Sequence, residues 1–324
     1  MAYGDFELLC HRANIPLCPL VGPYNTVGGA FTQGVLPRCY ARSIDLANTL
    51  VFNVGNVFLQ FGTFVVLAII IYNSYQKYTA VGRREMLDFF YLFTFLTLWS
   101  MIIDTGVVAA DAGAYPWFVA VQMGISGALC MELLCTGLIG FQLWEDGIAA
   151  SVWGIRTLAT LWGVGNFITA ILTFKSWGGL DPQHTVALMT VNYVINAVLL
   201  FLYVCMMLYF TSVLLREWWA CGAVGLGVFF FVAGQLLMYA FGYEICDSVK
   251  HYVDGIFFAT VCNMFAVLMI YKAWDITTSE DLEFVVSNTE SAWDLKSALA
   301  ADDVYGDYNS EYAMSHYTMP VPAM

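Results

Sequence analysis

The chain has 324 residues, of which 60% are hydrophobic and only 11% charged, and its mean hydropathy is +0.69. Soluble domains carry about a quarter charged residues, so these values exclude an ordinary soluble globule. The net charge of −13 lies mostly at the C-terminal end, because the residues from Asp275 to Met324 hold ten acids and one lysine. No basic stripe is present to displace counterions from phosphates, which argues against nucleic acid as a partner.

Residues 1–47 are expected to form a lumenal N-terminal segment. They lack a charged stretch followed by an apolar one, so we expect the first hydrophobic span to act as an uncleaved insertion signal. Cys10, Cys18 and Cys39 lie in this segment, and Cys246 lies in the loop before the last span. An even set of cysteines facing an oxidising compartment predicts two disulfides that tie the segment to that loop, and all three pairings are open.

Residues 48–273 are expected to form a membrane domain. Seven stretches are long enough to cross a bilayer core of about 30 Å as helices. Their continuous apolar character, without a two-residue alternation, favours helices over barrel strands. The sequence therefore predicts an all-α polytopic membrane protein, a seven-transmembrane-helix bundle with antiparallel neighbours. We place the spans at 48–72, 88–110, 117–141, 153–174, 187–214, 218–242 and 252–273.

The orientation of the bundle follows from its positive residues. Seven spans put the 1–2, 3–4 and 5–6 loops on the same side as the C-terminal tail. Seven lysines and arginines lie on that side, against five on the other. Because positive residues favour the cytosolic side, this small excess predicts a lumenal N-terminus and a cytosolic tail.

Several ionisable or amide side chains lie inside the spans, where they are costly and are therefore candidates for function. Such side chains also join helices through hydrogen bonds. For the amides this structural role is the simpler interpretation, whereas for the two carboxylates both interpretations are open. The candidates are Asp104, Glu132, Asn166, Asn192, Asn196, Gln235 and Asn263.

Templates for catalysis match this sequence poorly. The four histidines are too scattered to predict a zinc site, and no lysine lies deep in the last span to hold retinal. Neither a glycine-rich phosphate loop nor a nucleophile elbow is present, so we expect no catalytic residue, cofactor or metal. The alternative class is a seven-helix receptor or small-molecule transporter, which needs a ligand-sized polar cavity that reaches mid-membrane. All eight prolines lie outside the helix interiors, which argues against the broken helices of many transporters.

Nine stretches in collinear order resemble one family, the fungal chitin synthase export chaperones. They are GVLPRCYARSIDLANT (34–49), QKYTAVGR (76–83), YPWFVAVQ (115–122), GFQLWEDG (140–147), LTFKSW (172–177), YVINA (193–197), FFFVAGQLLMYAF (229–241), ICDSVKHYVDGIFF (245–258) and YKAWDITTSEDLEF (271–284). The resemblance implies a multi-pass protein of the endoplasmic reticulum membrane that binds a chitin synthase and enables its export to the cell surface, for cell wall chitin synthesis. It leaves open whether the chaperone accompanies its client to the plasma membrane. The chemistry would belong to the client.

A chaperone of this kind would use its polar groups within the lipid bilayer. A client helix with polar groups is costly when it is exposed to lipid, and pairing with Asp104, Glu132 or the amides lowers that cost. Our hypothesis is that one face of the bundle shields such a segment until the client is assembled.

Residues 274–324 are expected to form an acidic cytosolic tail. Asp281 and Glu283 are separated by one residue and resemble the diacidic signals that vesicle coat proteins read through a basic surface. In a tail with ten acids, such a triplet is also expected by chance. A second interpretation, compatible with the signal, is a short amphipathic helix that Thr277 or Thr278 caps. From Ser287 onward, too few aliphatic side chains are present to offset chain entropy, so residues 287–324 are predicted to be disordered and receive no role.

Overall fold

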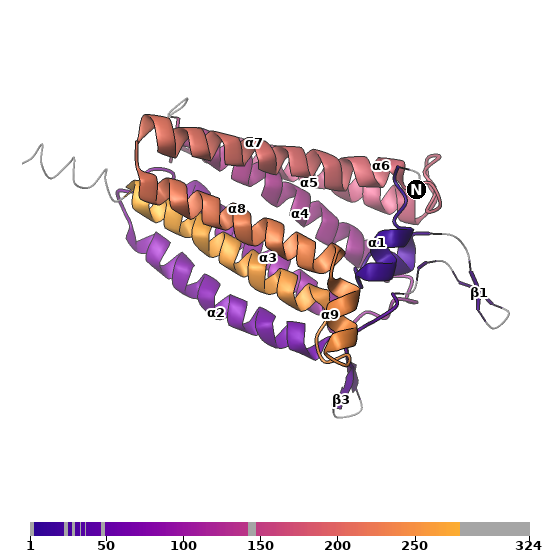
Figure 1. The fold of residues 1–324 in the computed structure, drawn as a ribbon. Helices are drawn as coiled ribbons and strands as arrows, with labels where there is room; N and C mark the ends of the chain where they lie inside the picture. The colour runs from indigo at the N-terminus through magenta and orange to yellow at the C-terminus, as the bar shows by residue number, and fades with distance from the viewer. Residues whose placement is uncertain are drawn as a thin grey trace, which may run out of the picture. The chain divides into compact units, whose positions relative to one another are not determined.

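The computed structural model describes residues 3–22, 25–27, 30–32, 34–35, 37–46, 49–141 and 147–278. Within this part, seven helices are long and apolar enough to cross a bilayer, which confirms the predicted seven-helix fold class of a multi-pass membrane protein. They are α2 (Val54–Gln76), α3 (Arg83–Asp104), α4 (Tyr115–Ile139), α5 (Ala149–Phe174), a fifth helix (Val186–Leu214), α8 (Trp218–Tyr239) and a last helix (Gly255–Thr278). Figure 1 shows these helices side by side in one bundle.

The fifth helix changes its winding three times along its length, because it contains two π-helical segments. It consists of α6 (Val186–Met189), the π-helical segment η2 (Thr190–Ile195), α7 (Asn196–Tyr209) and a second π-helical segment, η3 (Phe210–Leu214). Hydropathy predicts this span but gives no signal for the π segments. Such segments are rare and often occur at functional sites, and η2 contains the candidate Asn192.

Helix α4 is the centre of the bundle and packs most closely against α5, and also against α3 and α7. Small residues make this approach possible. A Cβ atom at Gly124 would lie 3.0 Å from the carbonyl oxygen of Gly163, and one at Gly163 would lie 2.9 Å from the carbonyl oxygen of Gly124. The two glycines therefore face each other across α4 and α5, and larger residues there would push the helices apart.

The first predicted span begins too early. Residues Thr49–Val51 (β4) pair antiparallel with Ile44–Leu46 (β3), so α2 begins only at Val54. Residues 49–51 therefore belong to a strand of a hairpin, which a hydropathy average cannot separate from the helix that follows.

Among the other spans, the second and the last are displaced furthest at their ends. Helix α3 covers Arg83–Asp104 instead of 88–110, and Gly106, in the left-handed region with φ +74°, follows its end. The last helix continues past the predicted end at residue 273 to Thr278. Asp275 in this extra turn pairs with Lys77 and Lys272, which offsets the cost of a charge at the end of the helix.

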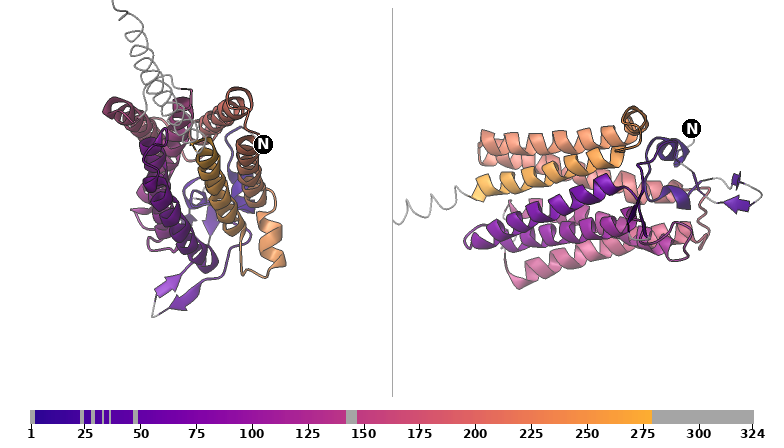
Figure 2. Two further views of the ribbon diagram at one scale, coloured as in Figure 1. Left: turned by 90° about the vertical axis from the view of Figure 1, so that its left-hand side faces the viewer. Right: turned by 90° about the horizontal axis from the view of Figure 1, so that it is seen from below.

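Short elements outside the spans gather at one end of the bundle (Figures 1 and 2). They are α1 (Glu7–Arg12), η1 (Cys18–Leu20), the hairpin of β1 (Asn25–Val27) and β2 (Ala30–Thr32), the hairpin of β3 and β4, and α9 (Gly242–Ser248). A buried cluster fixes the N-terminal segment to the bundle: Phe6, Leu17 and Val21 pack with Val119 of α4 and Ile171 of α5.

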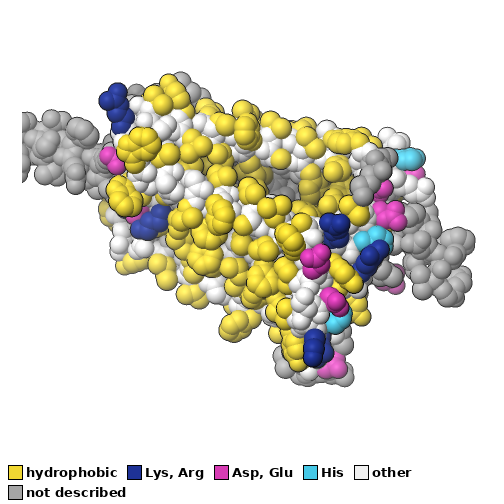
Figure 3. Space-filling view, viewed as in Figure 1, with side chains coloured by type: hydrophobic (Ala, Val, Ile, Leu, Met, Phe, Trp, Pro, Cys, Tyr) yellow, Lys and Arg dark blue, Asp and Glu magenta, His cyan; other side chains and the backbone are white. Residues whose placement is uncertain are grey.

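The flank of the bundle is apolar, as a lipid-facing surface requires. Figure 3 shows hydrophobic side chains over the helices and charged side chains gathered mostly towards the two ends. Phe58, Phe201 and Phe229, on α2, α7 and α8, are all more than 60% exposed. This distribution fits a protein whose sides contact acyl chains and whose ends contact water.

Candidate functional site

The first polar cluster joins α2 to the end of α3. Asn56 Nδ2 and Gln60 Nε2 donate to the same carboxylate oxygen, Asp104 Oδ2, at 2.8 and 2.9 Å. Asn56 and Gln60 are four residues apart, so they share one face of α2. Both amides are buried, at 0% and 3% exposure, while Asp104 is half-buried. The side chain of Asp104 is therefore held by its own bundle.

A second carboxylate lies at the same end of the bundle, at the start of the last helix. Asp254 Oδ1 accepts from the N–H of Phe257 at 3.2 Å, which caps the helix, and Asp254 Oδ2 accepts from Asn53 Nδ2 at 3.1 Å. Burial raises the pKa of Asp254 above 3.8, although these hydrogen bonds oppose the shift. Asp254 also acts electrostatically on Asp104. We call Asn53, Asn56, Gln60, Asp104 and Asp254 the carboxylate cluster.

Sequence reasoning identified only Asp104 among these five as a candidate. One signal was available: Asn53, Asn56 and Gln60 recur at intervals of three and four residues, so they line one face of the first span. A polar stripe on an otherwise apolar helix indicates a buried polar partner, because lipid offers none.

The second polar group links α5 to the fifth helix and contains three of the predicted amides. Asn196 Oδ1 accepts from Trp162 Nε1 at 2.9 Å, and Asn196 Nδ2 donates to Asn166 Oδ1 at 3.1 Å and to the carbonyl of Asn192 at 2.9 Å. Asn192 Nδ2 donates to Thr169 Oγ1 at 3.2 Å. We call this set the asparagine network. Its bonds join neighbouring helices, which is what the structural interpretation of these amides predicts.

Gly127 gives the asparagine network its space. A Cβ atom at this position of α4 would lie 2.6 Å from the side chain of Asn166. The amide therefore packs directly on the backbone of α4, and the central helix takes part in the arrangement.

The remaining predicted polar residues lie apart from these two groups. Glu132 is buried in α4 and makes no hydrogen bond through its carboxylate to another described residue, and its charged neighbours are Asp88 and Arg156. Those two form a bidentate pair between α3 and α5 at 2.7 and 2.8 Å. Gln235 and Asn263 are half-buried on α8 and the last helix, and Asn263 Oδ1 is buried without a hydrogen-bond partner in the described part of the chain.

An apolar groove of about 600 Å³ lies between the end of α4 and the start of α5. Its lining contains Cys135, Leu138, Ile148, Ala150, Ser151, Gly154, Ile155 and Leu158. Ser151 Oγ is buried there without a partner among the described residues. Glu132 precedes Cys135 by three residues, so it lies about one turn from the groove on α4. The groove is at the end of the bundle opposite the carboxylate cluster.

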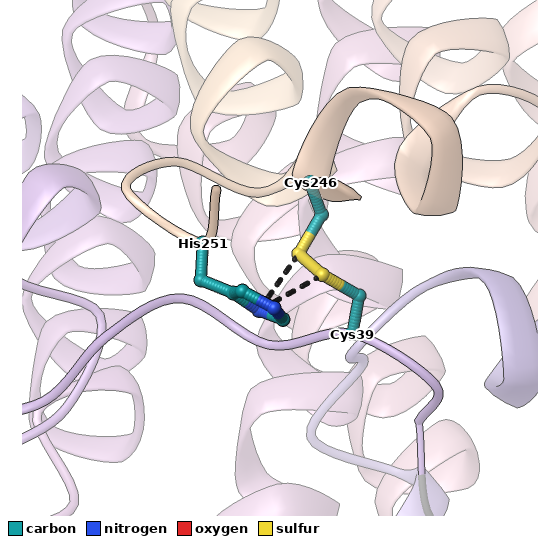
Figure 4. A group of neighbouring side chains, drawn as sticks. All are labelled: Cys39, Cys246 and His251. Carbon is teal, nitrogen blue, oxygen red and sulfur yellow. Dashed lines mark hydrogen bonds between the residues drawn. A yellow bond between two sulfur atoms is a disulfide. The ribbon is translucent and has the colours of Figure 1, made fainter. Parts of the chain in front are cut away.

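The four candidate cysteines are joined in two disulfides. Cys10 is bonded to Cys18 within the N-terminal segment, and Cys39 is bonded to Cys246 of α9. The second bond links residues 207 positions apart in sequence. Figure 4 shows His251 beside it, with Nδ1 3.2 Å from Cys39 Sγ. A metal would need thiolates, and both sulfurs are occupied in this covalent bond, so the group is a structural tie.

The diacidic pair Asp281 and Glu283 lies outside the residues that the structure describes, as does the segment from residue 287 onward. The stretch 142–146, inside one of the motifs that suggested the family, also lies outside them.

Comparison with known proteins gives a consistent result. The sequence model described as chitin synthase export chaperone matches residues 2–288. The chain is 48% identical to a chitin synthase export chaperone of Emericella nidulans over 98% of this chain and 96% of the relative. The corresponding proteins of Aspergillus oryzae and Candida albicans are 46% and 48% identical, over 98% and 90% of this chain and 96% and 94% of the relatives.

No solved structure gives a significant match. The family model covers seven-eighths of the sequence, including all seven membrane helices. This protein belongs to the chitin synthase export chaperone family.

Proposed function

We propose that this protein binds a chitin synthase in the endoplasmic reticulum membrane and enables its export to the cell surface. The observation that supports this most strongly is the family match over residues 2–288, combined with relatives of that name at almost full length. A bundle with an apolar flank and small residues between its helices offers contact surface to another membrane protein. We infer that the protein makes and breaks no bonds itself, and that synthesis is left to the client.

The proposed orientation places the N-terminal segment in the lumen and the acidic tail in the cytosol. This orientation is supported by the two disulfides, which lie at the end of the bundle that holds the N-terminal segment. Disulfides persist in oxidising compartments such as the lumen. Lys77 and Lys272, with Asp275, lie at the other end, in agreement with the preference of positive residues for the cytosol.

We place the client contact at the groove between α4 and α5. Its walls are apolar, so its occupant is a membrane-spanning segment of the synthase rather than a soluble ligand. Ser151 provides a hydroxyl without a partner in the described structure, and Glu132 provides a carboxylate one turn away. Polar groups of a client helix would pair with these two, which lowers the cost of carrying them through lipid. Gln235 and Asn263 are candidates for a second contact, on α8 and the last helix.

The groove can be filled without repacking the bundle. A Cβ atom at Gly154 meets no atom within 4 Å, and Gly154 lines the groove. Gly154→Trp is therefore expected to reduce the amount of chitin synthase that co-purifies with the protein. Gly165→Trp is the matched control, because Gly165 is also on α5, a Cβ atom there also meets no atom within 4 Å, and Gly165 lies about three turns from Gly154 and does not line the groove. Equal recovery of synthase with both variants would contradict this placement.

In the tail, we propose Asp281 and Glu283 as the export signal that vesicle coat proteins read. Replacing both with Ala should retain the protein and its client in the endoplasmic reticulum, and normal delivery would count against the signal.

The function as a whole is tested by deleting the gene in a strain with a fluorescent chitin synthase. We expect the synthase to accumulate in the endoplasmic reticulum while an unrelated secretory cargo reaches the surface. Delivery of the synthase at the normal rate, or arrest of both cargoes, would contradict a dedicated chaperone.

A further inference from the structure

We propose that the start of α3 holds the start of α5 away from α4 and so keeps the groove between α4 and α5 open. Arg84, Glu85 and Asp88 of α3 are the positioning residues, and none of them lines the groove. The inference rests on the proposed function in one respect, because it takes the groove as the place of client contact.

Helices α4 and α5 are close at one end and apart at the other. At one end, the backbones of Gly124 and Gly163 face each other directly. Towards the other end, Cys135 and Leu138 of α4 line the groove opposite residues 148–158. An open groove forfeits the van der Waals contacts that drive helix association in membranes. Its walls are therefore expected to close unless another part of the bundle holds them apart.

The first restraint is on the backbone of Gly147, two residues before α5 begins. Its N–H donates to Glu85 Oε1 at 3.0 Å, and its carbonyl oxygen accepts from Arg84 Nη1 at 2.9 Å. Glu85 is only 1% exposed, so its carboxylate is a fixed acceptor. The next residue, Ile148, already lines the groove. Helix α3 thus holds the point from which this wall of the groove starts.

The second restraint is the ion pair of Asp88 with Arg156 of α5. Arg156 Nε and Nη2 donate to the two carboxylate oxygens at 2.7 and 2.8 Å. A bidentate pair of this kind fixes orientation as well as distance. The side chain of Asp88 is 17% exposed, so the pair is partly shielded from water.

The direction of this second restraint follows from the helical spacing on α5. Gly154 and Arg156 are two residues apart, so their side-chain directions differ by about 200° around the helix axis. Gly154 lines the groove, whereas Arg156 reaches α3. Ile155, between them, is buried with Ile139 of α4. The ion pair therefore acts on the side of α5 that faces away from the groove, which is where a restraint must act to hold the groove open.

The first test measures the groove without any client. It uses the full-length protein in detergent, with spin labels at Leu138→Cys and Ile148→Cys on opposite walls. Dipolar broadening of the electron paramagnetic resonance spectrum increases as the two labels approach. The five free cysteines are first replaced by Ala: Cys130, Cys135, Cys205, Cys221 and Cys262.

Asp88→Asn and Glu85→Ala are each expected to increase the broadening, because the wall formed by α5 moves towards α4. Glu85→Gln should keep the original spectrum, since its amide oxygen can still accept from Gly147. Asp275→Asn is the matched control, because it breaks ion pairs at the same end of the bundle without touching α5. Unchanged broadening in Asp88→Asn, or an equal increase in Asp275→Asn, would overturn the inference.

A charge-swapped protein covers the case in which Asp88→Asn does not fold. Asp88→Arg combined with Arg156→Asp places the same two charges on the opposite helices and can form the pair again. It is expected to recover the original spectrum, whereas Asp88→Arg alone should not. Failure of the folded double variant to recover the spectrum would contradict the assignment of the restraint to this pair.

The second test measures the amount of chitin synthase that co-purifies with each variant. Asp88→Asn should lower it about threefold, the size of effect that the loss of one exposed or partly exposed ion pair produces. In a Gly154→Trp background, Asp88→Asn should cause no further loss, because both changes act through the same groove. A further loss of equal size would show that Asp88 acts elsewhere and would overturn the inference.

The two tests separate this inference from the proposed function. If the spectrum changes in Asp88→Asn but neither this variant nor Gly154→Trp loses synthase, α3 holds the groove and only the placement of the client is wrong. If the spectrum does not change but Gly154→Trp loses synthase, the client placement stands and the role of α3 is overturned.

Discussion

The asparagine network and the carboxylate cluster are both polar groups in an apolar bundle, yet their hydrogen bonds are completed to different degrees. In the asparagine network, Asn196 uses both its oxygen and its nitrogen, and Asn166 bonds through both of its side-chain polar atoms. In the carboxylate cluster, two amides compete for one oxygen and leave both of their own oxygens unpaired. The comparison indicates that amides that bond one another across two helices use most of their polar atoms, with Asn192 Oδ1 the exception among the described residues, whereas amides that share one acceptor leave their own oxygens unpaired.

The largest expected effect comes from breaking the asparagine network. Asn196→Leu leaves Trp162 Nε1 and Asn166 Oδ1 buried without partners, which should lower the free energy of unfolding by about 1–3 kcal/mol. Thermal unfolding of the purified protein in detergent measures the loss.

Asn192→Leu is the control within the same network. It removes one bond, to Thr169 at 3.2 Å, and its Oδ1 has no partner to lose among the described residues. Its cost should therefore be clearly smaller than that of Asn196→Leu. Equal losses in the two variants would mean that the network stabilises by packing and that its hydrogen bonds contribute little.

The sequence predicts the seven helices because twenty or so apolar residues in a row have few other structures available in lipid. It does not predict the partners of the polar residues. Asn166 and Asn196 lie thirty positions apart, and only the rotation of α5 and of the π-containing fifth helix about their axes brings them together. That rotation follows from packing, such as the contact of Gly124 with Gly163, which hydropathy does not encode.

The same limit applies at the carboxylate cluster. Asp104 is a predicted candidate because a single charge in an apolar span is conspicuous. Asn56 and Gln60 were missed because single amides barely change the mean hydropathy of a span. Their spacing of four residues was visible, but the residue that they face is on another helix. Fold class is therefore a property of composition along the chain, and the site is a property of contacts between distant parts of it.

A smaller effect, of opposite sign, is expected when charge is removed from the incomplete cluster. Asp104→Asn should leave the stability unchanged or raise it by up to about 1 kcal/mol, because a partly buried carboxylate without an ion-pair partner among the described residues disappears, while the new amide oxygen can still accept from Asn56 and Gln60. The measurement is thermal unfolding without divalent ions, beside the wild type. Marked destabilisation of Asp104→Asn under these conditions would show that the carboxylate is already well satisfied, and the contrast between the two clusters would be lost.

The smallest expected effect concerns the pH dependence of the carboxylate cluster. Burial raises the pKa of Asp254, so the folded state binds a proton more tightly than the unfolded state does. Stability from this group is therefore fully present below its unfolded pKa and is lost as the pH rises through the raised pKa of the folded state. Asp254→Asn removes this component and keeps the helix cap, because asparagine also caps well. The unfolding temperatures of the two proteins are measured from neutral to acidic pH without added divalent ions. As the pH falls, the unfolding temperature of the wild type should rise relative to that of Asp254→Asn. A difference that is constant with pH would mean that Asp254 titrates alike in the folded and unfolded protein, and that the cap, rather than the charge, determines its contribution.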